Sequence, residues 1–294
     1  MKCNGFVWLL IGLLFVGCST TTKVYELKDT ADQAFELKNY AAALSGYEQI
    51  IERFKTEGRT DECPVYGKAG LAALETGNIN KALDYLQMDT YTDFVSDETY
   101  YGLAQGYRKI DNLSKEIMAL KDYMEKFPAG KHLNEVKTRL FETYVESENW
   151  ELAGTLWPEI PDTNKDEALI TKWFFVNRAL ENEDQVDIIS TRLLKMNSSN
   201  IPALEWQAEK AYKKAEDHYQ EEMEAYENNK TNRQYKKLLE ELKVVTTEFK
   251  EAKQRYEKLY SLNPNSDYAL HLSNIFARLN DKEKSEFYRK LSGN

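Results

Sequence analysis

The chain has 294 residues, with 39 basic and 49 acidic side chains and a formal net charge of −10. A negative balance repels phosphate, so it argues against nucleic acid as a partner and against a domain lying flat on anionic lipid. The length allows one large domain or two ordinary ones.

Residues 1–18 combine a positive end, an apolar run and a small residue before a cysteine. Lys2 precedes the run Phe6–Val16, and Gly17 precedes Cys18. A spanning helix needs about 20 apolar residues, so the run is too short to span and instead fits a secretory signal. The pattern resembles the lipobox of a bacterial lipoprotein, with Phe15 where that motif usually has Leu.

That resemblance implies a signal peptide over 1–17, lipid attachment (diacylglycerol and palmitate) at Cys18, and a tether over 18–28. Two alternatives stay open: an ordinary cleaved signal peptide and an uncleaved short anchor. More than one acyl chain gives a durable anchor. Ser19 rather than Asp follows the cysteine, which in known lipoproteins favours the outer membrane. We therefore expect a lipid-anchored protein of the bacterial cell envelope, at the outer membrane and facing the periplasm.

The three cysteines leave no disulfide framework. Cys3 departs with the signal and Cys18 is acylated, so Cys63 has no partner. No His or Lys lies close in sequence to lower its pKa, so we expect an inert side chain at Cys63 rather than a reactive thiol.

Glycine and proline are scarce enough to predict an all-α fold. After Gly154 the next glycine is Gly293, and neither glycine nor proline occurs between Pro202 and Pro264. Strand-rich folds need turn residues far more often. Segments this rich in Glu, Lys, Ala and Leu favour helix.

A pattern of small and large apolar residues recurs at intervals of roughly 34 to 39 residues. A shift of 34 relates the two clearest copies, with Glu116 replacing Ala82. They are Tyr66, Ala69, Gly70, Ala73, Ile79, Ala82 and Leu86, then Tyr100, Leu103, Ala104, Tyr107, Leu113 and Leu120.

This pattern resembles the tetratricopeptide repeat (TPR), a pair of antiparallel helices of about 34 residues. The resemblance implies a right-handed superhelical solenoid of antiparallel helix hairpins, because each hairpin leaves an apolar face that the next must cover. It covers residues 29–202 and a terminal, capping pair at 263–294. A non-repetitive helical bundle is the alternative. Among lipoproteins, the TPR lipoprotein of the β-barrel assembly machinery is a distant likeness.

Residues 166–200 lack the small-residue pattern, but we expect a hairpin that turns near 181–184. The adjacent aromatics Trp173–Phe175 either line a ligand pocket or, as we expect, fill the core between hairpins. Pro158 and Pro161 are expected to shorten the preceding helix.

Residues 203–262 predict an extended helical hairpin. Two apolar stripes at steps of three and four are joined by the polar loop 227–233, which is typical of a coiled-coil-like antiparallel pair. The extra length predicts a finger over about 216–248, projecting on the order of 15–20 Å. It is either a partner-binding arm or a structural extension.

The sequence contains no catalytic or cofactor motif. Its histidines (His132, His218 and His271) are far apart, and no cysteine pair offers a zinc site. No phosphate-binding loop or nucleophile elbow is present. We therefore expect no enzyme activity, no metal and no cofactor.

The sequence thus indicates a scaffold that binds another protein of the envelope through its concave surface, its finger or both. Candidate contacts are the residues that share a helix with packing positions but point away from them, and the finger loop: Tyr101, Gln105, Arg108, Lys109 and Asn229. Arg and Tyr are frequent at binding hot spots. The alternative is a surface glycan- or nutrient-binding lipoprotein that serves an outer-membrane transporter. Exposed aromatics gathered in one cleft favour the glycan, whereas an open surface of mixed charge favours a protein. The oligomeric state stays open.

Overall fold

The computed structural model describes residues 17–293, with side chains from residue 23 on, and every regular element there is a helix. The predicted signal peptide lies outside the described residues except for Gly17. The first unit's helices are α1 (Gly17–Glu36), α2 (Tyr40–Thr56), α3 (Tyr66–Glu75), α4 (Ile79–Asp89), α5 (Asp97–Lys109), α6 (Leu113–Lys126), α7 (Leu133–Glu146) and α8 (Trp150–Leu156). The second unit's are α9 (Glu167–Ala179), α10 (Glu183–Met196), α11 (Ile201–Asn228), α12 (Asn232–Leu262), α13 (Ser266–Arg278) and α14 (Lys282–Leu291).

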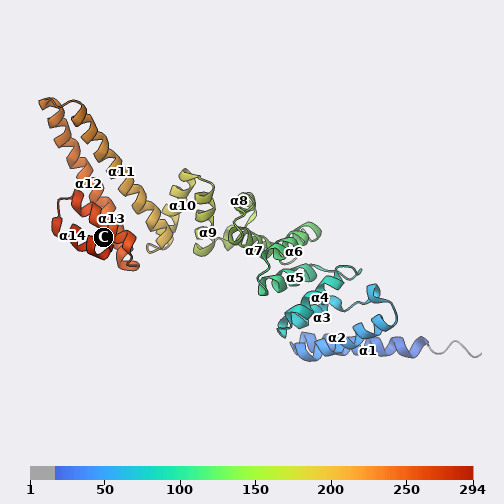
Figure 1. Ribbon diagram of the computed structural model, residues 1–294. Helices are drawn as coiled ribbons and strands as arrows, with labels where there is room; N and C mark the ends of the chain where they lie inside the picture. The colour runs from blue at the N-terminus through green and yellow to red at the C-terminus, as the bar shows by residue number, and fades with distance from the viewer. Residues whose placement is uncertain (1–16, 294) are drawn as a thin grey trace, which may run out of the picture. The chain divides into compact units, whose positions relative to one another are not determined.

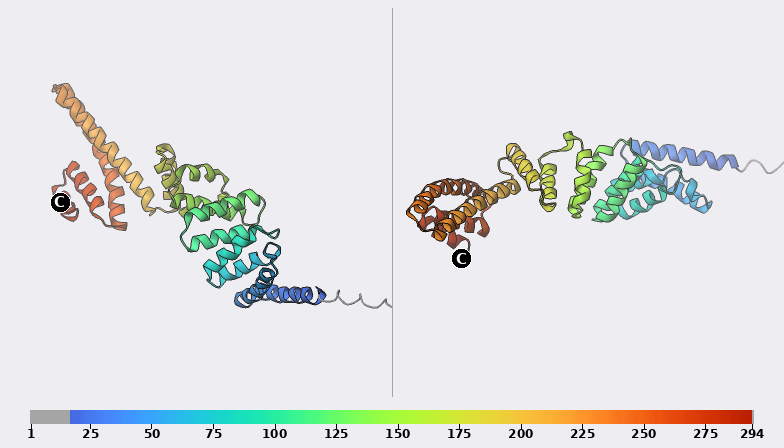
Figure 2. Two further views of the ribbon diagram at one scale, coloured as in Figure 1. Left: turned by 45° about the vertical axis from the view of Figure 1, so that its right-hand side comes forward. Right: turned by 90° about the horizontal axis from the view of Figure 1, so that it is seen from above.

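The chain divides into two compact units, one ending at Pro161 and the other beginning at Asp162. Consecutive helices pair as hairpins, and within each unit a hairpin packs on the next (Figures 1 and 2). This pairing confirms the prediction of an all-α fold of TPR-like antiparallel hairpins. Residues 18–28, expected as a tether, belong to α1, which is helical from Gly17.

Six of the hairpins turn in the same way. One residue takes a left-handed backbone conformation: Lys38, Gly77, Asp111, Glu148, Glu181 or Asn280, with φ between 54° and 78°. An Asn or Asp follows each of them and occupies the N-cap of the second helix. Such a residue can accept a hydrogen bond from the first helical N–H groups, so it starts the second helix immediately after the turn.

Small residues in the first unit let neighbouring helices approach closely. A Cβ on Gly102 would lie 2.9 Å from Leu71 Cδ2 and 3.0 Å from Leu86 Cδ1, so α5 touches both helices of the preceding hairpin. Large side chains fill the space beside these contacts, and Tyr47, Tyr66, Tyr123 and Phe141 are fully buried. Stacking therefore buries apolar surface that one hairpin alone leaves in water.

The second unit begins with the hairpin expected at 166–200, which turns at residues 180–182. Phe174 and Val176 are buried in it, Trp173 is half-buried and Phe175 is 39% exposed, so the aromatic run supplies core only in part. The preceding helix α8 is short, and Pro158 lies in a 3₁₀ turn after it.

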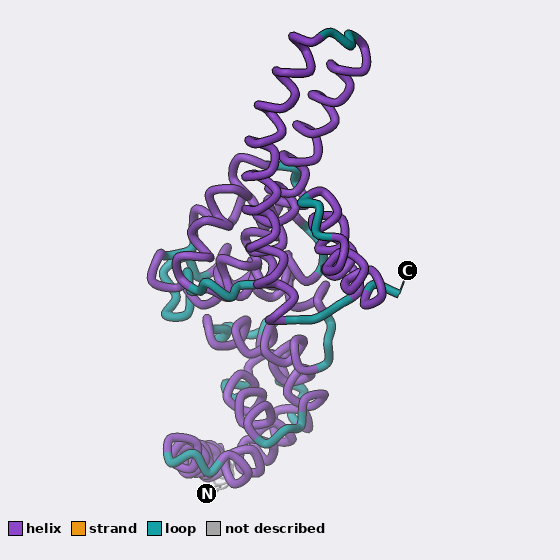
Figure 3. Tube along the Cα trace, turned by 90° about the vertical axis from the view of Figure 1, so that its left-hand side faces the viewer, coloured by secondary structure: helices purple, strands orange, loops and turns teal. Residues whose placement is uncertain are grey.

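The extended hairpin is formed by α11 and α12, which comprise 28 and 31 residues. A core of Leu204, Ala208, Ala215, Phe249, Tyr256 and neighbours joins its base to α13 and α14. The distal hairpin (residues 220–246) continues beyond those two helices (Figure 3). The extended helical hairpin predicted from the two apolar stripes is therefore present.

Candidate functional site

Helices α5 and α7, the first helices of adjacent hairpins, share one polar surface in the first unit. Tyr101 of α5 stacks on His132, with ring centroids 4.0 Å apart and planes within 3°. The two ring nitrogens of His132 lie 3.3 Å from carboxylate oxygens of Glu98 and Glu135. Burial, with the hydrogen bond to Glu135, raises the pKa of Tyr101 to about 12, so its hydroxyl remains a neutral donor.

About two helical turns further along, two arginines meet three glutamates. Arg108 of α5 pairs with Glu146, and its Nη1 lies 3.7 Å from Glu116 Oε2. Arg139 of α7 donates from Nε to Glu116 Oε1 at 2.6 Å and from Nη1 to Glu142 at 3.1 Å. Glu116 is 1% exposed, and its Oε2 has no hydrogen-bond partner. A buried carboxylate is costly unless cations compensate it, so part of the role of both arginines is structural.

The structure places three of the predicted contacts on this surface, which we call the α5–α7 face. Gln105 is exposed between Tyr101 and the Arg108 cluster. Lys109 is also exposed, but it forms no hydrogen bond or ion pair within residues 23–293 and so is not joined to the cluster. Asn229 is exposed in the loop of the second unit's long hairpin. The predicted residues therefore belong to two separate surfaces.

His132, Arg139 and the glutamates of this face were not among the contacts predicted from the sequence. The 34-residue repeat could have found part of the set, because it maps Gln105 onto Arg139 and Tyr101 onto Glu135. Glu116 also carried a signal, because it stands where the preceding copy of the repeat has the buried Ala82, although it belongs to α6, the second helix of its hairpin.

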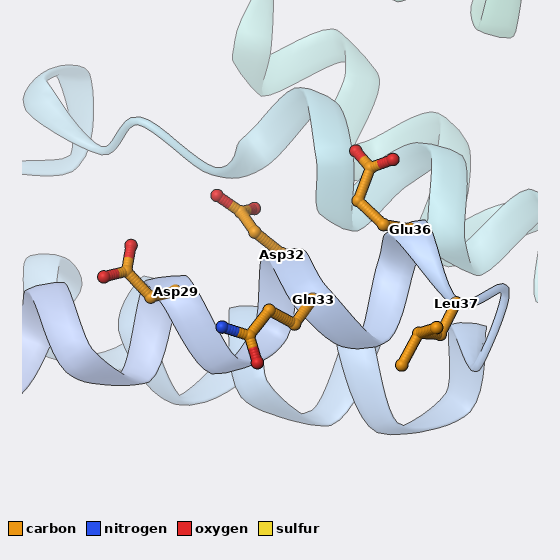
Figure 4. A pocket seen from close by; sticks show the side chains of 5 residues that line it. All are labelled: Asp29, Asp32, Gln33, Glu36 and Leu37. Atoms are coloured by element: carbon orange, nitrogen blue, oxygen red, sulfur yellow. The ribbon is translucent and has the colours of Figure 1, made fainter.

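A pocket of 510 Å³ lies along α1, lined by Asp29, Asp32, Gln33, Glu36 and Leu37. The three carboxylates point to the same side of the helix (Figure 4). Asp32 is already occupied, because Lys28, Lys68 and Tyr47 donate to it at 2.6, 2.9 and 2.7 Å. The Lys68 contact also links α1 to α3, so the Asp32 end of the pocket is part of the packing between hairpins.

The remaining reactive side chains offer no catalytic arrangement among the residues with described side chains. Burial raises the pKa of the Cys63 thiol to about 11, and this cysteine is fully buried. No group of three or more His, Cys, Asp or Glu is placed to hold a metal ion in that part of the chain. None of the helices within residues 17–293 is both apolar and long enough to cross a bilayer.

No protein-family model matches the sequence, and no curated protein matches it significantly. Among solved structures, a tetratricopeptide repeat protein from Parabacteroides merdae is similar at 12% identity, covering 93% of this chain and all of that one, with a TM-score of 0.47. The C-terminal part of a TPR repeat-containing protein from Cytophaga hutchinsonii shares 15% identity over 88% of this chain and 97% of that one, with a TM-score of 0.46. Pseudomonas aeruginosa pilF shares 15% identity over 76% and 87%, with a TM-score of 0.45. The helix pairing described above, rather than these likenesses, defines the fold.

The α5–α7 face can make contacts typical of protein recognition. It offers the ring edge of Tyr101, the exposed side-chain amide of Gln105, and positively and negatively charged side chains along about three turns of helix. Its outer ion pairs, Arg108–Glu146 and Arg139–Glu142, are only partly buried, so a partner's charged groups can exchange with them at modest cost.

Proposed function

We propose that the chain is a lipid-anchored, non-catalytic TPR scaffold of the bacterial cell envelope, which holds a segment of another protein on its α5–α7 face. The observation that carries the proposal is the mixed charge of that face around Tyr101, with Arg108 and Arg139 set among Glu116, Glu142 and Glu146. Exposed aromatics gathered in one cleft would favour a glycan, and this face has a single stacked tyrosine instead. The lipobox-like sequence at Cys18 supports the anchor.

Photocrosslinking in intact cells tests the face directly. A photoreactive residue replaces Gln105, which is exposed between the two parts of the cluster, and Tyr91 serves as a control because it is 71% exposed in a loop of the same unit. We expect a discrete protein adduct from position 105 and none from position 91. Charge reversal at Arg108 (Arg108→Glu) should remove the adduct. Equal adducts from both positions, or none from position 105, would reject the proposal.

A further inference from the structure

The long hairpin has two unlike flanks, and ion pairs hold one of them. His218 Nδ1 of α11 lies 2.9 Å from Glu248 Oε2 of α12, and Lys214 Nζ lies 3.0 Å from the other oxygen of Glu248. Nearer the tip, Lys237 pairs with Glu222 at 2.7 Å. The charged groups on this flank thus find partners within the hairpin itself.

On the other flank, α13 and α14 cover the base of the hairpin with aromatic contacts. Tyr212 and Tyr256 pack on His271 of α13, with ring centroids 5.0 and 4.5 Å apart. Arg278 of α13 lies 4.0 Å above the ring of Tyr219. Tyr260 meets a tyrosine of α14 at 5.5 Å.

Those covered stripes continue past α13, where no other described helix of the second unit lies over Tyr235 and Leu239. Seven-residue steps stay on one side of a helix in a coiled-coil-like pair. On α11 they lead from Tyr212 and Tyr219 to Tyr226. On α12 three steps lead from Tyr256 to Tyr235 and from Tyr260 to Leu239.

We call this continuation the distal apolar flank; its residues are Met223, Tyr226, Tyr235, Leu239 and Leu242. Tyr235 and Leu239 are 48% and 45% exposed. The flank belongs to the distal hairpin, which extends beyond α13 and α14 in Figure 3. The flank continues the face of the hairpin on which α13 and α14 pack. Another helix can therefore pack on it in the same way.

A row of lysines borders this flank. Lys236, Lys243 and Lys250 are also seven residues apart, and at 100° per residue they lie just outside the Leu239 stripe. All three are exposed, and none forms an ion pair within residues 23–293. On the α11 side the border is Gln220 and Glu227, and Glu227 is neutralised by Lys230 at 2.6 Å. The unpaired charge nearest the flank is therefore positive and belongs to α12, with the exposed Glu240 lying beyond Lys236 and Lys243 around the same helix.

We propose that the distal apolar flank binds an amphipathic α-helix of another protein, about three turns long, with acidic residues along the edge that faces α12. The part of α12 that belongs to the distal hairpin runs from Tyr235 to Thr246, which is 11 residues at 1.5 Å each. This span of about 17 Å sets the length of the bound helix. The inference rests on the proposed function in treating the chain as a protein-binding scaffold, and it specifies the chemistry of one partner segment.

A second copy of the chain fits this flank poorly. An isologous pair brings the same patch of both copies together. With the two hairpins antiparallel, α12 would lie on α12 and the lysine rows would repel each other. If the two hairpins ran parallel, the base of each hairpin would have to occupy the position that α13 of the other copy already fills.

Binding of designed peptides to the full chain in detergent tests the proposal. One fluorescent 14-residue helical peptide carries a leucine stripe with a glutamate edge, and its control has the same stripe with a lysine edge. We expect the acidic peptide to bind roughly tenfold more tightly, as three weak exposed pairs allow. Replacing Lys236, Lys243 and Lys250 by Glu should reverse the preference, and these substitutions change only exposed side chains.

Serine substitutions locate the apolar contact. Tyr235→Ser with Leu239→Ser should abolish binding of both peptides. Val244→Ser is the matched control, because Val244 is 48% exposed on the ion-paired flank, and it should leave both affinities unchanged. Equal affinity for the two peptides, or binding that survives the double serine variant, would overturn the proposal.

Crosslinking in cells separates this inference from the scaffold proposal. A photoreactive residue at Leu239 should give an adduct with a helical, acidic segment of another protein, and one at Val244 should not. An adduct with a second copy of this chain counts against the inference. Loss of the position 239 adduct while the position 105 adduct persists rejects the distal flank alone, whereas absence of both rejects the scaffold.

Discussion

At the residue scale, the glycines of the first unit set how closely its helices approach. A Cβ on Gly70 would lie 2.5 Å from Leu86 Cγ and 3.1 Å from the backbone N of Leu86, which cannot move aside. Overpacking costs about 1–3 kcal/mol, and alanine recovers up to about 1 kcal/mol of helix propensity. We expect Gly70→Ala to lower the free energy of unfolding by about 1 kcal/mol, measured by urea denaturation.

The control is the same substitution in a Leu86→Ala background. There the side-chain clash is gone, so Gly70→Ala should cost distinctly less. An equal cost in both backgrounds would show that packing against Leu86 is not the cause.

Asp32 gives the first unit an acid-sensitive contact. Burial alone would raise its pKa, but hydrogen bonds from Lys28, Lys68 and Tyr47 hold the pKa below its ordinary value of 3.8. A lowered folded pKa contributes stability that is present above the unfolded value and is lost as pH falls through the folded one. We expect Asp32→Asn to lower Tm at pH 7, and the difference in Tm from the unsubstituted chain to narrow as the pH falls below about 4.

Asp29→Asn is the matched control on the same helix, since Asp29 is exposed and forms no ion pair within residues 23–293. Its Tm should follow the unsubstituted chain at both pH values. A gap for Asp32→Asn that does not shrink between pH 7 and pH 3 would contradict the ion-pair explanation.

At the element scale, the distal hairpin is separable from the core that holds its base. The core that joins the base of the hairpin to α13 and α14 falls outside 220–241, and the buried Leu238 lies in the hairpin itself. Removing 220–226 together with 235–241 takes seven residues from each helix and preserves the side on which each stripe lies. We expect this variant to keep its Tm within about 2 °C by circular dichroism, while losing the acidic peptide.

Removing five residues from each helix instead provides the comparison. At 100° per residue it turns the tip by about 140° relative to the base, so the tip can no longer close the hairpin in register. The Tm should then fall further than in the seven-residue variant. A large loss of Tm in the seven-residue variant would mean that the distal hairpin supports the core.

The hairpin turns show which features of the repeat are visible in the sequence and which are visible only in the structure. Asn39, Asn112 and Asn149 can be recognised in the sequence. The residue before each of them differs in type, and these residues share only a left-handed backbone conformation. The long hairpin departs from this turn, because its loop at 229–231 has no such residue. The sequence signal for that loop was its polarity alone.

At the scale of the whole molecule, membrane attachment depends on Cys18 under the proposed function. We expect the natural chain to sediment with envelope membranes and to incorporate labelled palmitate, and Cys18→Ser to do neither. If both chains are soluble, residues 1–17 act as an ordinary cleaved signal. If both sediment with membranes, those residues remain as an uncleaved anchor.

The candidate site was predictable only in part. The repeat pointed to α5 and selected Tyr101, Gln105 and Arg108 as residues directed away from packing. It could not show that Arg108 is already paired with Glu146 or that Tyr101 lies on His132, because those partners come from a neighbouring hairpin. Lys109 was selected by the same argument, yet it lies outside the cluster.

The sequence by itself determined the helices, their pairing and the extended hairpin, because helix periodicity and scarce turn residues act locally along the chain. Only the tertiary structure decided which side of each helix is covered. It placed α13 over Tyr256 and α14 beside Tyr260, and left Tyr235 and Leu239 exposed at the distal ends of those two stripes. Periodicity fixes which residues share a side of one helix, but whether that side meets water depends on contacts between segments distant in the sequence.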